Sequence, residues 1–169
     1  QEYLGKGLNV LYLVPEIGLT PQVTEAVLKR FGNTVAILHS ELSPSQKLSE
    51  WKRILTKKAR IVIGARSAIF APVPDLGLII IDEEHDSSYK SGSSPRYHAR
   101  QIAMKRSNQN KIPLVMGSAT PSVEAWHLMK ENQIKKHCLT RRLAGGKMPE
   151  IKAINLSLYK TEDCISEKL

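Results

Sequence analysis

Short apolar runs alternate along this chain with longer segments in which apolar residues recur at helical spacing. Short runs rich in β-branched residues indicate strands, and spacings of three and four residues indicate helices. The runs predict strands at 8–14, 35–38, 60–64, 78–81, 113–117 and 151–156. Because strands that alternate with helices over short connections build parallel sheets, we expect an α/β protein with a mostly parallel sheet flanked by helices.

Three of the predicted helices have recognisable starts. Thr20-Pro21 and Thr120-Pro121 each place a hydroxyl at the N-cap and a proline at the first helical position, and 43–46 forms a capping box. Each start follows a strand and presents backbone N–H groups that suit phosphate, although such residues are also simply good caps. The residues expected to face the core are Val23, Val27 and Phe31, then Leu48, Trp51 and Leu55, and finally Val123, Trp126 and Met129.

The segment after the fourth predicted strand reads differently. Residues 87–95 are rich in Ser, Gly and Pro, so we expect a mobile loop there. A basic helix is predicted to follow, from Arg96 to about Arg106. His39, His127 and His137 are expected to be structural or exposed rather than ligands.

The strand at 78–81 organises the rest of the chain. Its apolar run is continuous, which predicts a strand buried on both faces, and it ends in Asp82-Glu83-Glu84-His85. The carboxyl ends of parallel strands border the ligand crevice of an open α/β sheet. An apolar strand followed by Asp-Glu is also the pattern that holds magnesium beside nucleotide phosphates and places a carboxylate near the attacking water. The alternative is a strand that runs into a solvated acidic loop.

Composition narrows the class of partner. The formal net charge of +9 indicates a polyanionic partner, nucleic acid before membrane. No signal peptide and no apolar run of about 18 residues is present, so we expect no membrane span. Cys138 and Cys164 lie far apart, which argues against zinc and against a disulfide framework and predicts reduced thiols in a cytoplasmic protein.

The motifs together resemble a known family. Asp82-Glu83-Glu84-His85 resembles the Walker B box of superfamily 2 helicases, and Gly117-Ser118-Ala119-Thr120 resembles their motif III. More narrowly, 14–22 looks like the motif Ia region of the primosomal replication-restart helicases, and so do 63–70, 82–90 with 96–100, and 117–122. These blocks occur in the family's order. The resemblance implies a RecA-like motor domain that uses ATP and Mg²⁺.

The resemblance also implies a role for individual residues. Asp82 would hold magnesium through water, and Glu83 would polarise the water that attacks ATP. Glu84 and His85 would report the nucleotide state beside Gly117, and Ser118 and Thr120 would pass it to the DNA side. The residues implied in the single-strand path are Pro15, Glu16, Thr20, Gln22, Arg66 and Ser67. Those implied in the aromatic-rich loop that couples DNA binding to hydrolysis are Tyr89, Lys90, Arg96, Tyr97 and His98, because aromatic rings stack on bases and cations follow phosphate.

The chain departs from the family's pattern in one large respect. It contains no Gly-x-x-x-x-Gly-Lys-Ser/Thr phosphate loop, which the family carries just upstream of what is here Gln1. We therefore expect 1–142 to be part of the first motor domain and inactive alone, and 143–169 to be the end of that domain, leading to the second. The complete protein would be an ATP-dependent 3′-to-5′ DNA helicase of primosome assembly and replication restart. It would bind single-stranded and forked DNA and primosome proteins, with a zinc site outside this chain.

Three alternatives remain open at this point. The chain could belong to another superfamily 2 translocase. It could be a nucleic-acid-binding module whose acidic residues do no catalysis. Asp82, Glu83, His85 and His98 could instead be ligands of a metal-dependent hydrolase, although neighbouring carboxylates on a strand point in opposite directions.

Overall fold

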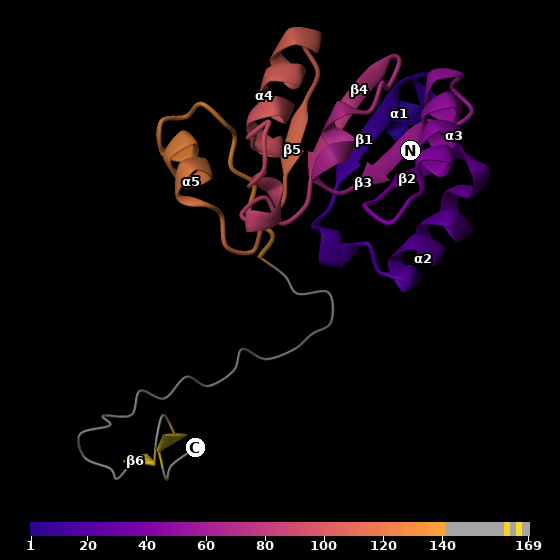
Figure 1. Ribbon diagram of the computed structural model, residues 1–169. Coiled ribbons are helices and arrows are strands. Elements are labelled where there is room, and N and C mark those ends of the chain that lie inside the picture. Colours follow the sequence, from indigo (N-terminus) through magenta and orange to yellow (C-terminus); the bar gives the residue numbers. More distant parts are fainter. Residues whose placement is uncertain (141–160, 163–164, 167–169) are drawn as a thin grey trace. The chain divides into compact units, whose positions relative to one another are not determined.

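The computed structural model describes residues 1–140, 161–162 and 165–166, and the chain divides into two compact units, 1–134 and 135–169 (Figure 1). The second unit contains a two-stranded antiparallel pair, β6 (Thr161–Glu162) and β7 (Ile165–Ser166). The predicted strand at 151–156 and the predicted domain boundary at 142/143 lie outside the described residues.

The first unit is built on a five-stranded sheet in which every pairing is parallel. Its strands are β1 (Asn9–Leu13), β2 (Val35–Leu38), β3 (Ile61–Gly64), β4 (Leu76–Ile81) and β5 (Leu114–Met116), in the spatial order β2-β3-β1-β4-β5 (Figure 1). This confirms the predicted α/β class and the five predicted strands that fall in this unit, each within three residues of its expected bounds. Since all five strands run in one direction, their carboxyl ends lie along one edge.

Helices and short 3₁₀ turns connect the strands. The α-helices are α1 (Glu2–Gly5), α2 (Pro21–Phe31), α3 (Pro44–Leu55), α4 (Ala99–Asn110) and α5 (Val123–Lys130). The 3₁₀ turns are η1 (Glu16–Gly18), η2 (Gly32–Thr34), η3 (Arg66–Phe70) and η4 (Ser87–Tyr89). No helix in the described part of the chain is both long and apolar enough to cross a membrane.

Two of the three predicted helix starts are confirmed. Thr20 Oγ1 accepts a hydrogen bond from the N–H of Val23, and Ser43 and Gln46 form both halves of a capping box. The third prediction is wrong, because Ser122 caps α5 by accepting from the N–H of Ala125 at 3.2 Å. Thr120 stays in the preceding turn, where its N–H donates to Ser118 Oγ. Ser122 offers the same kind of acceptor as Thr120, a side-chain hydroxyl. Hydrogen bonds from Ser122 to Glu84 favour Ser122 as the cap.

The sheet separates two apolar clusters. On one face, alternate residues of β1, β3 and β4 pack with α4 and η3, and this larger cluster includes Leu11, Val62, Ile79 and Ala103. On the other face, Ile61, Ile63 and Val35 pack with residues of α2. Burial along β4 alternates, so Ile79 and Ile81 are fully buried whereas Leu78 and Ile80 are half-buried. The prediction that this strand is buried on both faces is therefore wrong for one face in this structure.

The helix stripes predicted to face the core are also partly wrong. In α3, Leu48, Trp51 and Leu55 are 56%, 41% and 55% exposed, and Ile54 is the residue that enters the core. The reason is that α3 packs against β2, the edge strand of the sheet, so that only one side of the helix meets the core. Val23, Val123 and Trp126 are also exposed, whereas Val27 and Phe31 pack against the sheet.

Candidate functional site

The acidic run and the Ser118–Thr120 turn lie together at the carboxyl edge of the sheet. Because β4 and β5 are neighbours, the N–H of Gly117 donates to the carbonyl of Ile81 at 2.8 Å, and the N–H of Glu84 donates to the carbonyl of Gly117 at 3.0 Å. These two bonds bring residues more than thirty positions apart into one loop pair. The predicted proximity of the two motifs is confirmed.

Asp82 is held from three sides. The hydroxyl of Tyr12, on β1, donates to Asp82 Oδ2 at 2.9 Å, and the N–H of Glu83 donates to Oδ1 at 3.1 Å. The hydroxyl of Tyr89 donates to the carbonyl oxygen of Asp82 at 2.7 Å. Burial, followed by the bond to Asp82, raises the pKa of Tyr12 to about 12, so Tyr12 remains a donor at neutral pH. No motif in the sequence marks Tyr12, since an aromatic residue in a strand is usually assigned to the core.

Glu83 adopts a backbone conformation that few non-glycine residues use. Its φ is +43°, in the left-handed region, and its carbonyl accepts from the N–H of Asp86 at 2.8 Å in a tight turn. Such conformations cost of order 1–3 kcal/mol and persist where the surroundings enforce them. The turn leaves Glu83 exposed directly beside Asp82, with its carboxylate open to a ligand.

Glu84 points into the protein. Only 2% exposed, it accepts from Arg100 Nη1 at 2.7 Å, from the N–H of Ser122 at 2.7 Å and from Ser122 Oγ at 3.0 Å. Arg100 is itself buried and also contacts Glu124. We therefore correct the expectation for Glu84: it joins β4 to the starts of α4 and α5 and has no surface free for a nucleotide. A sequence motif could not reveal Arg100 as its partner, because nothing local links 84 to 100.

His85 connects the two motifs. Its Nδ1 lies 2.7 Å from Ser118 Oγ, and its Nε2 lies 3.4 Å from Thr120 Oγ1. The carboxylate of Glu83 lies 3.6 Å from the same Nδ1. The imidazole thus touches three of the residues that the sequence placed in one site. Any movement of Glu83 or of the Ser118–Thr120 turn changes the contacts of this ring.

The segment after the acidic run is more ordered than a mobile loop. Arg66 Nη1 donates to the carbonyls of Ser88 at 3.1 Å and Lys90 at 2.7 Å, and Lys90 and His98 form an antiparallel bridge. The guanidinium of Arg66 lies 5.9 Å from the ring of Tyr97, and its Nε is buried without a hydrogen-bond partner in the described structure. Arg66 therefore fixes this loop beside the end of β3.

Two residues of the expected aromatic-rich loop are used internally. Tyr89 is 0% exposed, so its ring has no surface on which a base could stack unless the loop opens. His98 Nδ1 accepts from the N–H of Arg100 at 3.2 Å and caps α4, which begins at Ala99 rather than at Arg96. Burial lowers the pKa of His98, which keeps this nitrogen an acceptor. Tyr97 is half-buried and packs edge-on against Phe70.

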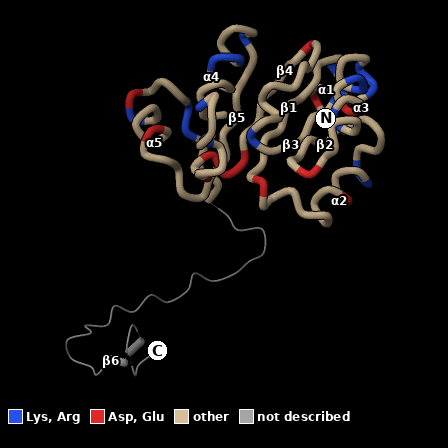
Figure 2. The backbone as a smooth tube through the Cα atoms, viewed as in Figure 1, with Lys and Arg blue, Asp and Glu red and all other residues tan. Residues whose placement is uncertain are grey.

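The other residues expected to contact nucleic acid differ in exposure. Pro15 is buried, and the hydroxyl of Thr20 caps α2. The exposed members of the set are Glu16, Thr20, Gln22, Ser67, Lys90 and Arg96. Figure 2 shows Lys and Arg on α3, α4 and other elements.

The donor set at Asp82 suits a magnesium ion bound largely through water. Mg²⁺ takes oxygen ligands and is commonly held by one or two carboxylates, with waters and substrate phosphates completing its shell. Asp82 and the exposed Glu83 supply such oxygens. Within the described residues, no three His, Cys, Asp or Glu side chains are placed to bind a metal by themselves.

Several known proteins are similar to this chain. The family model described as DEAD/DEAH box helicase matches residues 2–128. Replication restart protein PriA of Treponema pallidum is 56% identical over 154 residues, covering 91% of this chain and 23% of that protein. The PriA protein of Bacillus subtilis is 46% identical over 156 residues, covering 92% of this chain and 19% of that protein. The chain therefore spans about a fifth of the length of these relatives.

Among solved structures, the chain is similar to the C-terminal part of the Fun30 ATPase domain. The TM-score is 0.45 at 20% sequence identity, covering 82% of this chain and 42% of that chain.

Proposed function

Because the chain belongs to the DEAD/DEAH box helicase family, we propose that it forms part of the first motor domain of an ATP-dependent DNA helicase that acts in replication restart. The contact of His85 with Ser118 and Thr120, beside Asp82, is the observation that carries the proposal. It joins the nucleotide side of the site to the turn that follows β5. A solvated acidic loop would give no reason for such a contact.

The proposed chemistry is hydrolysis of the terminal phosphate of ATP. A bound Mg²⁺ would neutralise phosphate charge as the transition state forms. Asp82 would hold that ion through water, with Tyr12 and the N–H of Glu83 fixing the orientation of the carboxylate. Glu83 would polarise the attacking water, and its exposed carboxylate beside Asp82 is consistent with that task.

The proposed coupling to DNA runs through two contacts. His85 would carry the state of Glu83 to Ser118 and Thr120. A shift of Asp82 would move Tyr89, and with it the loop that Arg66 holds. This loop presents the exposed side chain of Lys90. In this scheme Lys90, Arg96 and Ser67 contact the phosphates of a single strand, and Tyr89 acts from inside the loop.

For the complete protein we propose translocation in the 3′-to-5′ direction, action on forked DNA, and assembly with primosome proteins. These proposals rest on the similarity to PriA proteins, which are named for replication restart. A second candidate is a nucleic-acid-binding module without catalysis. The exposed cations Lys90 and Arg96 are the observation that favours it.

The deciding experiment uses the complete protein with Glu83→Gln, and with Glu131→Gln as a control for an exposed carboxylate outside the site. We expect Glu83→Gln to retain ATP and DNA binding and to lose most DNA-stimulated hydrolysis, roughly 10²–10³-fold, because the water loses its general base. Glu131→Gln should behave as the unsubstituted protein. Normal turnover by Glu83→Gln would overturn the catalytic proposal and leave the binding-module candidate.

A further inference from the structure

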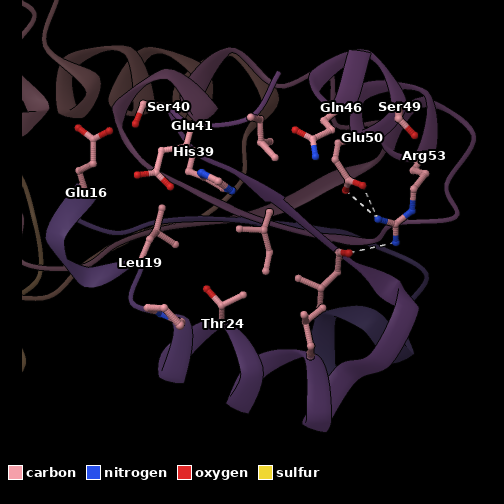
Figure 3. A pocket seen from close by; sticks show the side chains of 15 residues that line it. Glu16, Leu19, Thr24, His39, Ser40, Glu41, Gln46, Ser49, Glu50 and Arg53 are labelled. Carbon is pink, nitrogen blue, oxygen red and sulfur yellow. Dashed lines mark hydrogen bonds and ion pairs between the residues drawn. The ribbon is translucent and has the colours of Figure 1, made fainter. Parts of the chain in front are cut away.

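A groove lies at the free edge of the sheet, between α2 and α3 (Figure 3). Its volume is about 750 Å³, within the range of roughly 300–1,000 Å³ typical of ligand sites. We call it the β2 groove and define it by its apolar floor, from Leu19, Leu28, Val35, Ile37 and Leu42, and its acidic rim, from Glu16, Glu41 and Glu50. None of its lining residues takes part in the Asp82 site.

The rim of the β2 groove is negative although the chain is strongly positive. Arg53 is the one lysine or arginine among the described residues that line it. That guanidinium is already committed: Nη1 pairs with Glu50 at 2.7 Å, and Nη2 donates to the carbonyls of Asn33 and Val35. Glu16 and Glu41 remain exposed on the other side (Figure 3). The exposed carboxylates of Glu16 and Glu41 would attract a basic ligand.

The backbone of β2 is available for pairing. In the described part of the chain, β2 pairs only with β3 and forms the edge of the sheet. The carbonyls of Thr34 and Leu38 face β3, since they accept from the N–H groups of Arg60 and Ala65. The N–H and carbonyl of one residue point to the same side of a strand, and this side alternates along the chain, so those of Val35 and Ile37 face outward. Arg53 donates to the carbonyl of Val35, which leaves the outward N–H and carbonyl of Ile37 for pairing with another strand.

We propose that the β2 groove binds an extended basic segment of a partner protein, which adds a strand to β2. Its backbone would pair with the outward groups of Ile37, its apolar side chains would lie on the floor, and alternate lysine or arginine side chains would reach Glu16 and Glu41. Strand addition at an exposed edge obtains affinity from the backbone and specificity from pockets for alternate side chains. This inference does not depend on the proposed helicase activity.

The test measures binding of a fluorescein-labelled synthetic peptide of alternating lysine and valine to this chain by fluorescence anisotropy. We expect saturable binding that weakens as salt rises, and loss of roughly tenfold in affinity in the double variant Glu16→Lys/Glu41→Lys, because the two rim charges that have no cation beside them in Figure 3 are reversed. The matched control is Glu25→Lys/Glu131→Lys, which makes the same change of charge at exposed positions outside the groove. Circular dichroism shows whether both double variants fold.

Two further measurements separate the groove from general attraction between charges. A peptide of alternating lysine and glycine should bind at least several-fold more weakly, because it cannot fill the apolar floor. Hydrogen exchange at the amide of Ile37 should slow when the lysine–valine peptide binds. Absence of binding, equal weakening in both double variants, or unchanged exchange at Ile37 would each overturn the proposal.

Discussion

Tyr12 and Asp82 are 70 positions apart in the sequence, and the hydroxyl of Tyr12 donates a 2.9 Å hydrogen bond to Asp82 Oδ2. The sheet creates this contact, because β1 and β4 are parallel neighbours in which Tyr12 is level with Ile80, two residues before Asp82. Tyr12 on β1 thus orients the carboxylate of Asp82 at the end of β4. The carboxylate proposed to hold Mg²⁺ therefore has its own fixed support.

Tyr12→Phe in the complete protein tests this support. The ring keeps its packing and the carboxylate loses one donor, so we expect the Mg²⁺ concentration for half-maximal ATP hydrolysis to rise roughly tenfold, as for other partners of metal-binding groups. The free energy of unfolding should fall by only about 1 kcal/mol. Titration of ATPase activity with Mg²⁺ measures the first effect and denaturant unfolding the second. Tyr3→Phe on α1 is the control, and an unchanged Mg²⁺ requirement in Tyr12→Phe would refute the role.

The buried pair of Glu84 and Arg100 makes a second prediction, on stability. Arg100→Met should lower the free energy of unfolding of this chain by about 3–5 kcal/mol, because it leaves a buried carboxylate without its cation. Glu84→Gln/Arg100→Met should recover part of that loss, since the neutral amide still accepts from the N–H of Ser122. Urea unfolding of the two single variants and the double variant gives the coupling.

A half-exposed pair serves as the reference for this cycle. Arg53 and Glu50 lie at the same 2.7 Å separation, with side chains 30% and 20% exposed, and removal of their ion pair alone should cost about 1 kcal/mol or less. If the double variant at 84 and 100 were less stable than Arg100→Met, the buried charge would not be the cause of the loss.

The strands and the position of the acidic run could be predicted from sequence because both depend on local pattern. A run such as 61–64 is apolar enough to be a strand in any arrangement, and the carboxyl end of a parallel strand borders the site wherever its neighbours lie. The Tyr12 and Arg100 contacts could not be predicted, since each depends on which elements become neighbours. The helix stripes failed for the same reason: Trp51 has the spacing of a core residue, but α3 packs at the edge of the sheet.

His98 makes the third prediction, on the dependence of stability on pH. Burial lowers its pKa in the folded chain, and Nδ1 must stay unprotonated to accept from the N–H of Arg100. At pH values between the folded and the unfolded pKa of His98, the unfolded chain therefore binds a proton that the folded chain does not. The contribution of His98 is fully present above the ordinary histidine pKa of about 6.5 and is lost as pH falls through the lower folded value.

The measurement is urea unfolding at a series of pH values for this chain and two variants. His98→Asn keeps a capping acceptor and removes the titrating group, so it should lose less stability than the unsubstituted chain as pH falls below about 6.5. His127→Asn changes an exposed histidine on α5 and should follow the unsubstituted chain. Identical curves for all three proteins would show that the cap does not titrate.

The last prediction separates two adjacent residues, Tyr89 and Lys90. The side chain of Lys90 is exposed, while its carbonyl is held by Arg66, so Lys90→Ala should leave the fold unchanged. In the complete protein it should weaken single-stranded DNA binding, reduce the salt dependence of that binding by about one phosphate contact, and reduce DNA stimulation of the ATPase more than its basal rate. Binding at several salt concentrations and ATPase assays with and without DNA measure these effects.

Tyr89 should behave in the opposite way, because its ring lies in the core and its hydroxyl holds the carbonyl of Asp82. Tyr89→Ala should lower the free energy of unfolding by about 3–5 kcal/mol, as for other buried aromatic rings. Tyr89→Phe should cost about 1 kcal/mol and lower basal as well as DNA-stimulated hydrolysis, since the lost bond reaches Asp82 itself. If Tyr89→Ala instead matched Lys90→Ala, with weaker DNA binding and unchanged stability, the ring would leave the core to meet a base, and the loop would open when DNA binds.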